Sequence, residues 1–376
     1  MDTSTHNDYH DHSSEKPNKY IVIIILALSL AGIIYSFSLK PIGKDVISGK
    51  VLKVLSEKDT TQDFGKRNEI VKEQELLVEI MSGTEKKEIN ILNDYKPMSK
   101  GDKIFLRESL FGDNDWDMVN ISRIWELVIL FIFFIILVIL TSGLKGFYSL
   151  VGLLFSFTVI FAFIVPQILN GASPVNIGIG GAALILIPTL YLSYGLNKKS
   201  IAAFLGIIIA LLFVGIASNY FVNSLRLTGL EGEASLYLNM ASDNPINLIG
   251  LIIAGIIIAA VGVLDDVATI QSSVVFSLAK ADSTLRGFKL FKEAMKVGRD
   301  HISAVVNTLV LAYTGASLPL ILLLFIQEMP LGYLVSLEVI AEEIARTLIS
   351  SSGLLLAVPL TTVIATTMAS KNYQKV

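Results

Sequence analysis

The run INLIGLIIAGIIIAAVGVL, residues 246–264, decides the fold class. It contains no charged side chain, and as a helix it is long enough to cross the roughly 30 Å hydrocarbon layer of a membrane. Two acidic residues, Asp265 and Asp266, follow it directly. The sequence therefore predicts a membrane-spanning helix with two carboxylates near its inner end.

Similar apolar runs recur along the chain. Of its 376 residues, 53% are hydrophobic and only 17% are charged, whereas soluble domains have about 25% charged residues. The other runs occupy residues 20–37, 125–140, 147–165, 175–195, 201–221, 304–326 and 353–369. We therefore expect an α-helical polytopic membrane protein with about eight transmembrane helices.

Residues 40–122 are the one sizeable soluble block. Segments such as VISGKVLKVLSE and QELLVEIMSG alternate apolar and polar side chains and are separated by Gly, Asn, Asp and Pro. This pattern predicts a small antiparallel β-rich domain, an OB-like barrel or a sandwich. Its charges are mixed and its sequence has no aromatic ladder, so an extracytoplasmic cap or partner-docking module is favoured over a nucleic-acid or sugar platform.

The expected order of parts follows from these patterns. Residues 1–19 are polar and predict a disordered cytoplasmic tail. Its histidines, His6, His10 and His12, offer a metal site, but a flexible segment loses entropy when it closes around an ion. The remaining parts are a first transmembrane helix at 20–38, the β-rich domain inserted at 40–122, and a transmembrane helical domain at 124–370.

The distribution of lysine and arginine predicts the orientation. Lys145, Lys198, Lys199 and the segment 280–299 lie in loops on one side, together with lysines near both ends of the chain. Short loops rich in Lys and Arg face the cytoplasm. Both termini are therefore expected inside and the β-rich domain outside.

Two segments of the helical domain have amphipathic patterns. Within 272–298, basic residues at 286–296 lie opposite Phe288 and Phe291, which favours an in-plane helix on anionic lipids over an ordinary charged loop. Segment 331–350 fits an outer interfacial or re-entrant helix in which Glu342 pairs with Arg346. The following small residues at 350–353 predict a break and a discontinuous helix.

Polar groups in the apolar runs supply the candidate site. If the helix continues past Asp265, Thr269 lies on the same face, an arrangement that suits cation coordination or proton relay. The alternatives are a structural network with Arg299 or carboxylates in cytoplasmic water. Asn307 either lines a path or joins helices. The candidate residues are Asp265, Asp266, Thr269, Gln271, Arg299, Asp300, His301, Asn307, Thr314, Glu338, Glu342 and Arg346.

Several function classes lack sequence support. The chain has no cysteine, which excludes disulfides and thiolate metal sites, and its net charge of −3 gives no field for nucleic acid. The patterns GxxxxGK[ST], HExxH and GxSxG are missing, so no catalytic residue and no cofactor are predicted.

The strings GVLDDVATIQSS (262–273), GRDHISAVVNTLVLAYTGASLPL (298–320) and the run from Glu338 ending SSSGLLLAVPLTT resemble the YibE/F-like family. The resemblance covers roughly residues 20–370. It implies a multi-pass protein of the bacterial plasma membrane, of the Gram-positive type, with a transporter-like body. It assigns no role to any particular residue.

The favoured hypothesis is a secondary permease of an ion or small molecule, with an acidic polar site on the cytoplasmic side of the bundle. The alternative is a membrane scaffold or receptor whose outer β-domain binds an envelope partner. A membrane-embedded enzyme that acts on lipid is a third interpretation. The expected partner is the lipid bilayer, with anionic lipids at 286–296. The sequence also allows an oligomer.

Overall fold

The computed structural model describes residues 17–39, 46–63, 68–82, 85–94, 96–109, 116–230, 233–242, 245–326 and 329–372. The predicted tail and its histidines lie outside these residues, apart from positions 17–19. The chain divides into two compact units: Phe37–Gly143, and Met1–Ser36 together with Leu144–Val376. Each unit is described by itself below.

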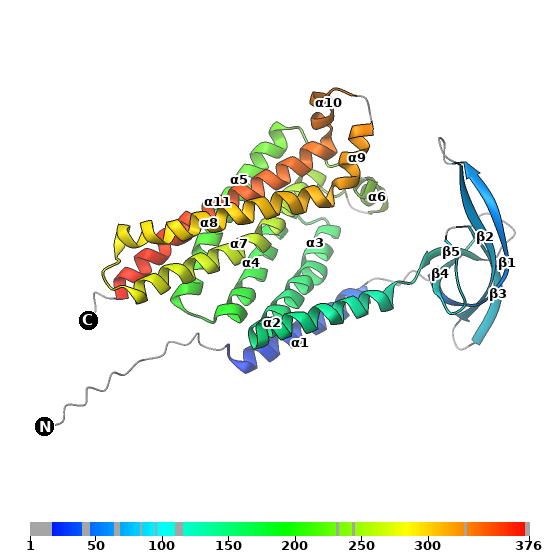
Figure 1. Ribbon diagram of the computed structural model, residues 1–376, viewed down its shortest axis with the longest axis horizontal. Helices are drawn as coiled ribbons and strands as arrows, with labels where there is room; N and C mark the ends of the chain where they lie inside the picture. The colour runs from blue at the N-terminus through cyan, green and yellow to red at the C-terminus, as the bar shows by residue number, and fades with distance from the viewer. Residues whose placement is uncertain are drawn as a thin grey trace. The chain divides into compact units, whose positions relative to one another are not determined.

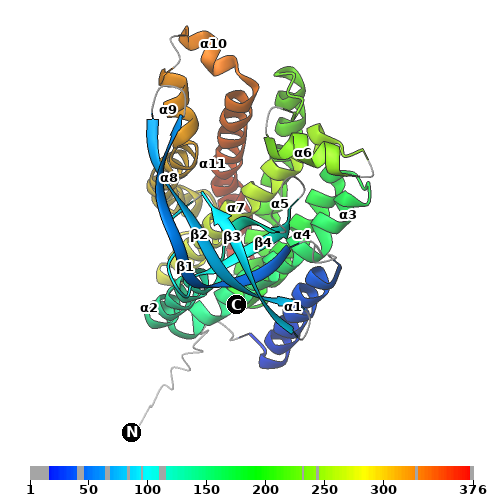
Figure 2. The ribbon, with the colours of Figure 1, turned by 90° about the vertical axis from the view of Figure 1, so that its right-hand side faces the viewer.

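The first unit contains a curled antiparallel sheet whose order is β3-β2-β1-β4-β5. Its strands are β1 (Val46–Asp63), β2 (Asn68–Ser82), β3 (Glu85–Asn93), β4 (Lys103–Glu108) and β5 (Trp116–Ile121). Strand β1 bends across the sheet (Figure 2) and has two register shifts, which strengthen strand curvature. Strands β3 and β5, at opposite ends of the order, contact each other.

Alternating side chains build the core of this unit. Leu76, Val78 and Ile80 of β2 are buried together with Ile104 and Leu106 of β4. This is the period-2 pattern of a strand with one covered face. The sheet therefore encloses its own small hydrophobic core.

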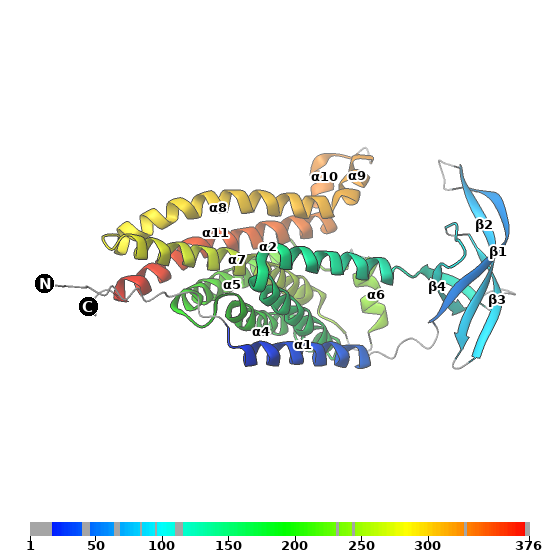
Figure 3. The same cartoon turned by 60° about the horizontal axis from the view of Figure 1, so that its bottom comes forward.

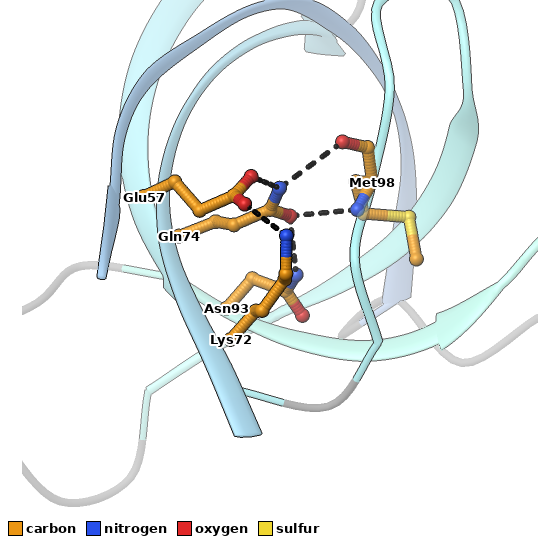
Figure 4. Close-up of polar contacts among 5 residues, drawn as sticks. All are labelled: Glu57, Lys72, Gln74, Asn93 and Met98. Atoms are coloured by element: carbon orange, nitrogen blue, oxygen red, sulfur yellow. Dashed lines mark hydrogen bonds and ion pairs between the residues drawn. The ribbon is translucent and has the colours of Figure 1, made fainter. Parts of the chain in front are cut away.

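A buried amide organises the polar end of the sheet. Gln74 accepts a hydrogen bond of 2.6 Å from the Met98 backbone N–H, and its Nε2 donates to Glu57 at 2.9 Å. Asn93 donates to Gln74 at 3.3 Å and to the Lys96 carbonyl at 2.7 Å. Figure 4 shows Gln74 at the centre of these contacts. Because a buried amide needs partners, this network fixes the segment that leads into β4.

The chain next forms one long helical stretch of 46 residues. It comprises α2 (Ile124–Thr158), the π-helix η1 (Val159–Ile164) and α3 (Val165–Leu169). Gly143 interrupts α2 with a φ of 57° and a ψ of −138°, a conformation that a glycine adopts without strain. The two apolar runs predicted at 125–140 and 147–165 therefore lie on either side of this kink.

The second unit is a helical bundle (Figure 1). Its other helices are α1 (Lys19–Leu39), α4 (Pro174–Tyr194), α5 (Lys198–Ser224), α6 (Glu233–Ala241), α7 (Leu248–Ala281), α8 (Gly287–Ala316), α9 (Leu318–Ile326), α10 (Leu331–Ser336) and α11 (Glu338–Asn372). Helices α5, α7 and α11 contact one another and form the centre of the bundle. Ile256, Ile257 and Leu354 are among its fully buried side chains.

Within the described residues, six helical stretches are long and apolar enough to cross a membrane. The predicted number of about eight is not confirmed by this count. Two predicted runs merge in the stretch that begins with α2, and the run 304–326 is divided between α8 and α9 at Ser317.

Glycine contacts bring the central helices close together. A Cβ added at Gly206 of α5 would lie 2.1 Å from Thr361 Oγ1 of α11, and one at Gly353 would lie 2.3 Å from Val214 Cγ2 of α5. Helix α11 continues through 350–353 and through Pro359. The predicted break there is therefore wrong: the small residues serve close packing between α11 and α5.

Both predicted amphipathic segments are parts of longer helices. Residues 287–298 form the first half of α8, whose Leu290, Ala294 and Gly298 are buried. The segment is therefore part of a longer helix that packs through these three residues, whereas Phe288 of the predicted apolar side is exposed, and its contact with anionic lipid stays a prediction. Within 331–350, α10 is short and residues 338–350 begin the 35-residue α11.

Three contacts gather the basic loops at one end of the bundle. The Asn18 N–H donates to Tyr191 Oη at 3.0 Å, and Ser272 Oγ donates to the Lys199 carbonyl at 2.8 Å. The Gly287 N–H donates to Ser370 Oγ at 3.3 Å. The start of α1, the α4–α5 and α7–α8 turns and the end of α11 consequently lie at the same end.

Candidate functional site

The acid pair lies in the second half of α7. At 1.5 Å per residue, Asp265 is about 26 Å along the helix from Leu248, so one bilayer thickness separates it from the far end. Asp265 is half-buried against the bundle, whereas Asp266 points to the exposed side of α7. The Oδ1 atom of Asp265 is buried, and no hydrogen-bond partner for it exists among the described residues.

Two neighbouring helices face the pair. Thr189 of α4 interacts with the Asp265 carboxyl, and His301 of α8 interacts electrostatically with Asp266. The orientation of His301 follows from local helix geometry, because Ala294 and Gly298 are buried on this side of α8 and His301 lies one turn further along it. Asp265 therefore lies toward α4, whereas Asp266 lies toward α8.

Arg299 does not neutralise the acid pair. Among the residues that the structure describes, no salt bridge joins it to Asp265 or Asp266. Arg299 instead lines a cavity beside α11. The described structure therefore does not contain the predicted network between Arg299 and the two carboxylates. Asp300, between Arg299 and His301, is exposed.

Two other predicted residues of α7, Gln271 and Thr269, have hydrogen-bond partners, as does the nearby Ser272. Gln271 Nε2 donates to the Ala294 carbonyl of α8 at 3.1 Å and to Thr362 Oγ1 of α11 at 2.8 Å. Thr269 donates to the carbonyls of Asp265 and Asp266 at 2.8 and 3.0 Å. Ser272 contacts the start of α5, as described above. Gln271 and Ser272 therefore join neighbouring helices, whereas Thr269 is satisfied by the backbone of α7 itself.

Two cavities lie side by side along α8 and α11. The first, about 490 Å³, is lined by Arg299, Ser303, Asn307 and Val310 of α8 with Leu355 of α11. The second, about 250 Å³, begins at the same Val310. Its polar lining consists of Tyr313, Thr314, Ser317, Glu343 and Thr347. The structure thus brings Arg299, Asn307 and Thr314 together on one face, away from Asp265.

The acidic residues of α11 have separate roles. Glu338 Oε1 accepts hydrogen bonds from the Thr228 N–H at 2.5 Å and the Gly229 N–H at 2.7 Å, so it anchors the loop after α5. Glu342 forms an ion pair with Arg346, which confirms the predicted pairing. The Nε of Arg346 lies 3.8 Å from Glu343.

The sequence interpretation missed Thr189 as a member of these polar groups. Thr189 follows Pro188 inside an otherwise apolar run, and this polar interruption was the available signal. Glu343 is adjacent to the predicted Glu342–Arg346 pair, but only the packing of α8 places it beside Tyr313. Within the described residues, no group of three His, Asp or Glu side chains is arranged to hold a metal ion.

Comparison with known proteins agrees with the helical architecture. A family model described as YibE/F-like protein matches residues 130–371, which is more than half of the chain. Neither curated proteins nor solved structures gave a match. The matched range begins in α2 and includes every helix from α4 to α11. The chain therefore belongs to the YibE/F-like family, and its long apolar helices identify it as a membrane protein.

Proposed function

We propose that this protein is a secondary transporter in which Asp265 takes up and releases a proton or a monovalent cation. The observation that carries the proposal is the buried Oδ1 of Asp265, which has no hydrogen-bond donor in the described structure. An ionised carboxylate inside a membrane helix is costly unless it is compensated. Binding a proton or cation removes that cost, so occupancy of Asp265 favours a different arrangement of the surrounding helices.

Asp266 and His301 complete the proposed site. Asp266 is adjacent to Asp265 and lies on the exposed side of α7, opposite the imidazole of His301. A histidine is suited to proton exchange with water. The route runs from the cytoplasm through His301 and Asp266 to Asp265. Thr189 of α4 lies beside the Asp265 carboxyl, and its hydroxyl donates to the Ile185 and Leu186 carbonyls of its own helix.

The proposed location is the bacterial plasma membrane, with both termini in the cytoplasm. The gathering of the basic loops at one end of the bundle supports this orientation. With this orientation the β unit would be extracytoplasmic. For this unit we propose an OB-like barrel, supported by the strand order and by the contact between β3 and β5.

The proposed number of crossings remains about eight. The kink at Gly143 divides the 46-residue stretch into two parts, each close to the length of one crossing. Helices α8 and α9 together supply another crossing. A tag after Ser242 should then be accessible outside intact cells, whereas a tag after Asp282 should be protected.

Proteoliposomes test the proposed site. A dye enclosed in the vesicles reports proton entry when a proton gradient and a potassium diffusion potential are imposed. We expect the wild-type protein to accelerate proton entry and Asp265→Asn to abolish the acceleration, because the amide keeps the volume but cannot release a proton. Asp300→Asn is the matched control, since Asp300 is exposed on the neighbouring α8. Equal flux in the Asp265→Asn variant and the wild type would exclude Asp265 as the site.

A further inference from the structure

The face of α8 that borders α11 forms a groove. Its two cavities meet at Val310 and extend from Arg299 at one end to Ser317 at the other. At 1.5 Å per residue this distance is about 27 Å, close to the roughly 30 Å thickness of the hydrocarbon layer. Figure 3 shows α8 and α11 side by side along their lengths. The groove is therefore long enough to connect the two leaflets.

The floor of the groove carries a row of polar side chains. Arg299, Ser303, Asn307 and Thr314 follow one another at helical spacing and are exposed. The described residues provide none of these four side chains with a hydrogen bond or an ion pair. In the middle of a bilayer such groups need a polar partner, because exposure to hydrocarbon leaves them unsatisfied.

The walls of the groove are apolar. Ile302, Val306 and Leu355 line the first cavity, and Ile340, Ile344 and Leu348 line the second. A polar floor between apolar walls matches a molecule that has a polar head and hydrocarbon chains. The head can follow the floor while the chains stay in the surrounding lipid.

The positive charge at the inner end favours an anionic head group as the molecule that enters the groove. Arg299, at the inner end, is a cation with no partner in the described structure, and guanidinium groups bind phosphate through paired hydrogen bonds. At the outer end Glu343 lies in the lining, and Arg346, 3.8 Å away, is shared between Glu343 and Glu342. The Nε of Arg346 is buried without a hydrogen-bond partner among the described residues.

We propose that the substrate of this transporter is an anionic phospholipid, whose head group crosses the membrane along the α8–α11 groove. This inference rests on the proposed function, because it names the substrate whose movement the proton or cation at Asp265 would drive. The phosphate first binds Arg299, and the head group then passes Ser303 and Asn307 to reach Thr314. No covalent bond changes in this process.

The purified full-length protein tests this inference in vesicles of phosphatidylglycerol and phosphatidylethanolamine that carry a trace of fluorescent phosphatidylglycerol. Dithionite added outside destroys the fluorescence of outer-leaflet lipid only, so the slow loss of the remaining signal measures transbilayer movement. A proton gradient is imposed as in the flux assay. We expect the wild-type protein to accelerate this loss over empty vesicles.

Groove variants give the specific readout. Arg299→Gln and Asn307→Leu should each slow the movement roughly ten-fold, the effect of losing a hydrogen bond to a charged head group. Both positions are exposed, so both variants should remain monodisperse. Thr308→Val is the matched control, because Thr308 lies outside both cavities and its hydroxyl bonds only to Val305 of the same helix. It should keep the wild-type rate.

Three outcomes overturn the proposal. Wild-type vesicles that move labelled phosphatidylglycerol no faster than empty ones exclude a lipid substrate, even if Asp265-dependent proton entry is intact. Equal rates for labelled phosphatidylcholine would exclude selection by charge. Efficient cross-linking of Asn307→Cys between two copies, in a chain without other cysteines, would show that the groove is a subunit interface.

The same assay separates this proposal from the proposed function. If Asp265→Asn moves labelled lipid at the wild-type rate while Arg299→Gln does not, the groove is supported and coupling through Asp265 is rejected. If both variants lose lipid movement and both lose the proton entry that is coupled to it, both proposals are supported.

Discussion

The two sides of α8 make opposite use of polar groups. On the side that faces α7, Gln271 donates to the Ala294 carbonyl of α8 and to Thr362 of α11, and the amide is buried and satisfied. On the side that forms the groove, Asn307 has a similar amide, but it is exposed and has no partner in the described structure. Residue type alone does not distinguish these positions.

This difference teaches where to look for function in a membrane bundle. A satisfied polar group contributes to helix association and can be explained by packing alone. An unsatisfied one in the same environment needs a ligand, a proton or a partner. By this criterion Asp265 and the α8–α11 groove stand apart from Gln271, Ser272 and Thr362.

The largest effect is expected where two helices touch without intervening side chains. Gly206→Leu should prevent recovery of folded protein, because even its Cβ would lie 2.1 Å from Thr361 Oγ1 and 3.0 Å from the Thr361 Cα. Size-exclusion chromatography in detergent measures the outcome. Gly215→Leu on the same helix is the control, since the nearest atom to its added Cβ is 3.9 Å away. A monodisperse Gly206→Leu protein would refute the close α5–α11 contact.

The next effect compares the two amides directly. Gln271→Leu should lower the free energy of unfolding by about 1 to 3 kcal/mol, because the Ala294 carbonyl loses its buried donor. Asn307→Leu should change it little, since that side chain makes no contact that is lost. Thermal unfolding in detergent, followed by circular dichroism of both variants, is the measurement. Equal destabilisation by the two substitutions would remove the distinction between the two sides of α8.

A smaller effect of opposite sign is expected at the acid pair. Asp265→Asn should raise the free energy of unfolding by about 1 kcal/mol, because it replaces a carboxylate whose buried Oδ1 has no hydrogen-bond donor in the described structure with a neutral group, and functional sites often cost stability. The melting temperature should therefore rise slightly while proton entry is lost. A marked decrease would show instead that the Asp265 carboxylate has a structural partner.

The smallest effect on stability is expected in the β unit, because its charged groups are exposed to water, which weakens their interactions. The hydrogen bond from Lys72, together with that from Gln74, lowers the pKa of Glu57 below its ordinary value of 4.5. Because the folded-state pKa is depressed, the contribution is present above pH 4.5 and is lost as the pH falls through the folded pKa. Below that pH the β unit should be slightly less stable.

Tryptophan fluorescence measures this loss in the full-length protein, since both tryptophans, Trp116 and Trp125, belong to the unit Phe37–Gly143. Glu57→Gln should flatten the acid dependence of the unfolding midpoint. Glu88→Gln is the control, because Glu88 has no hydrogen bond or ion pair within the described residues. A Glu57→Gln variant with an unchanged acid profile would contradict the assignment.

The sequence by itself determined the features that depend on neighbouring residues. The lengths of the apolar runs gave the membrane class, and alternation at 40–122 predicted the strands that form the sheet. The pairing of Glu342 with Arg346 depends only on a spacing of four residues in a helix. The small residues and proline at 315–319 likewise coincide with the junction between α8 and α9.

Only the tertiary structure decided which polar groups meet. Glu338 anchors a loop near Thr228, and Gln271 reaches Thr362, although these partners are far apart in the chain. Periodicity placed Arg299 near the acid pair, but the rotation of α8 turns it into the groove and turns His301 toward Asp266. That rotation is set by contacts such as Gly298 against Gln271 and Val358. A sequence pattern defines the faces of a helix, whereas the packing of its neighbours decides what each face meets.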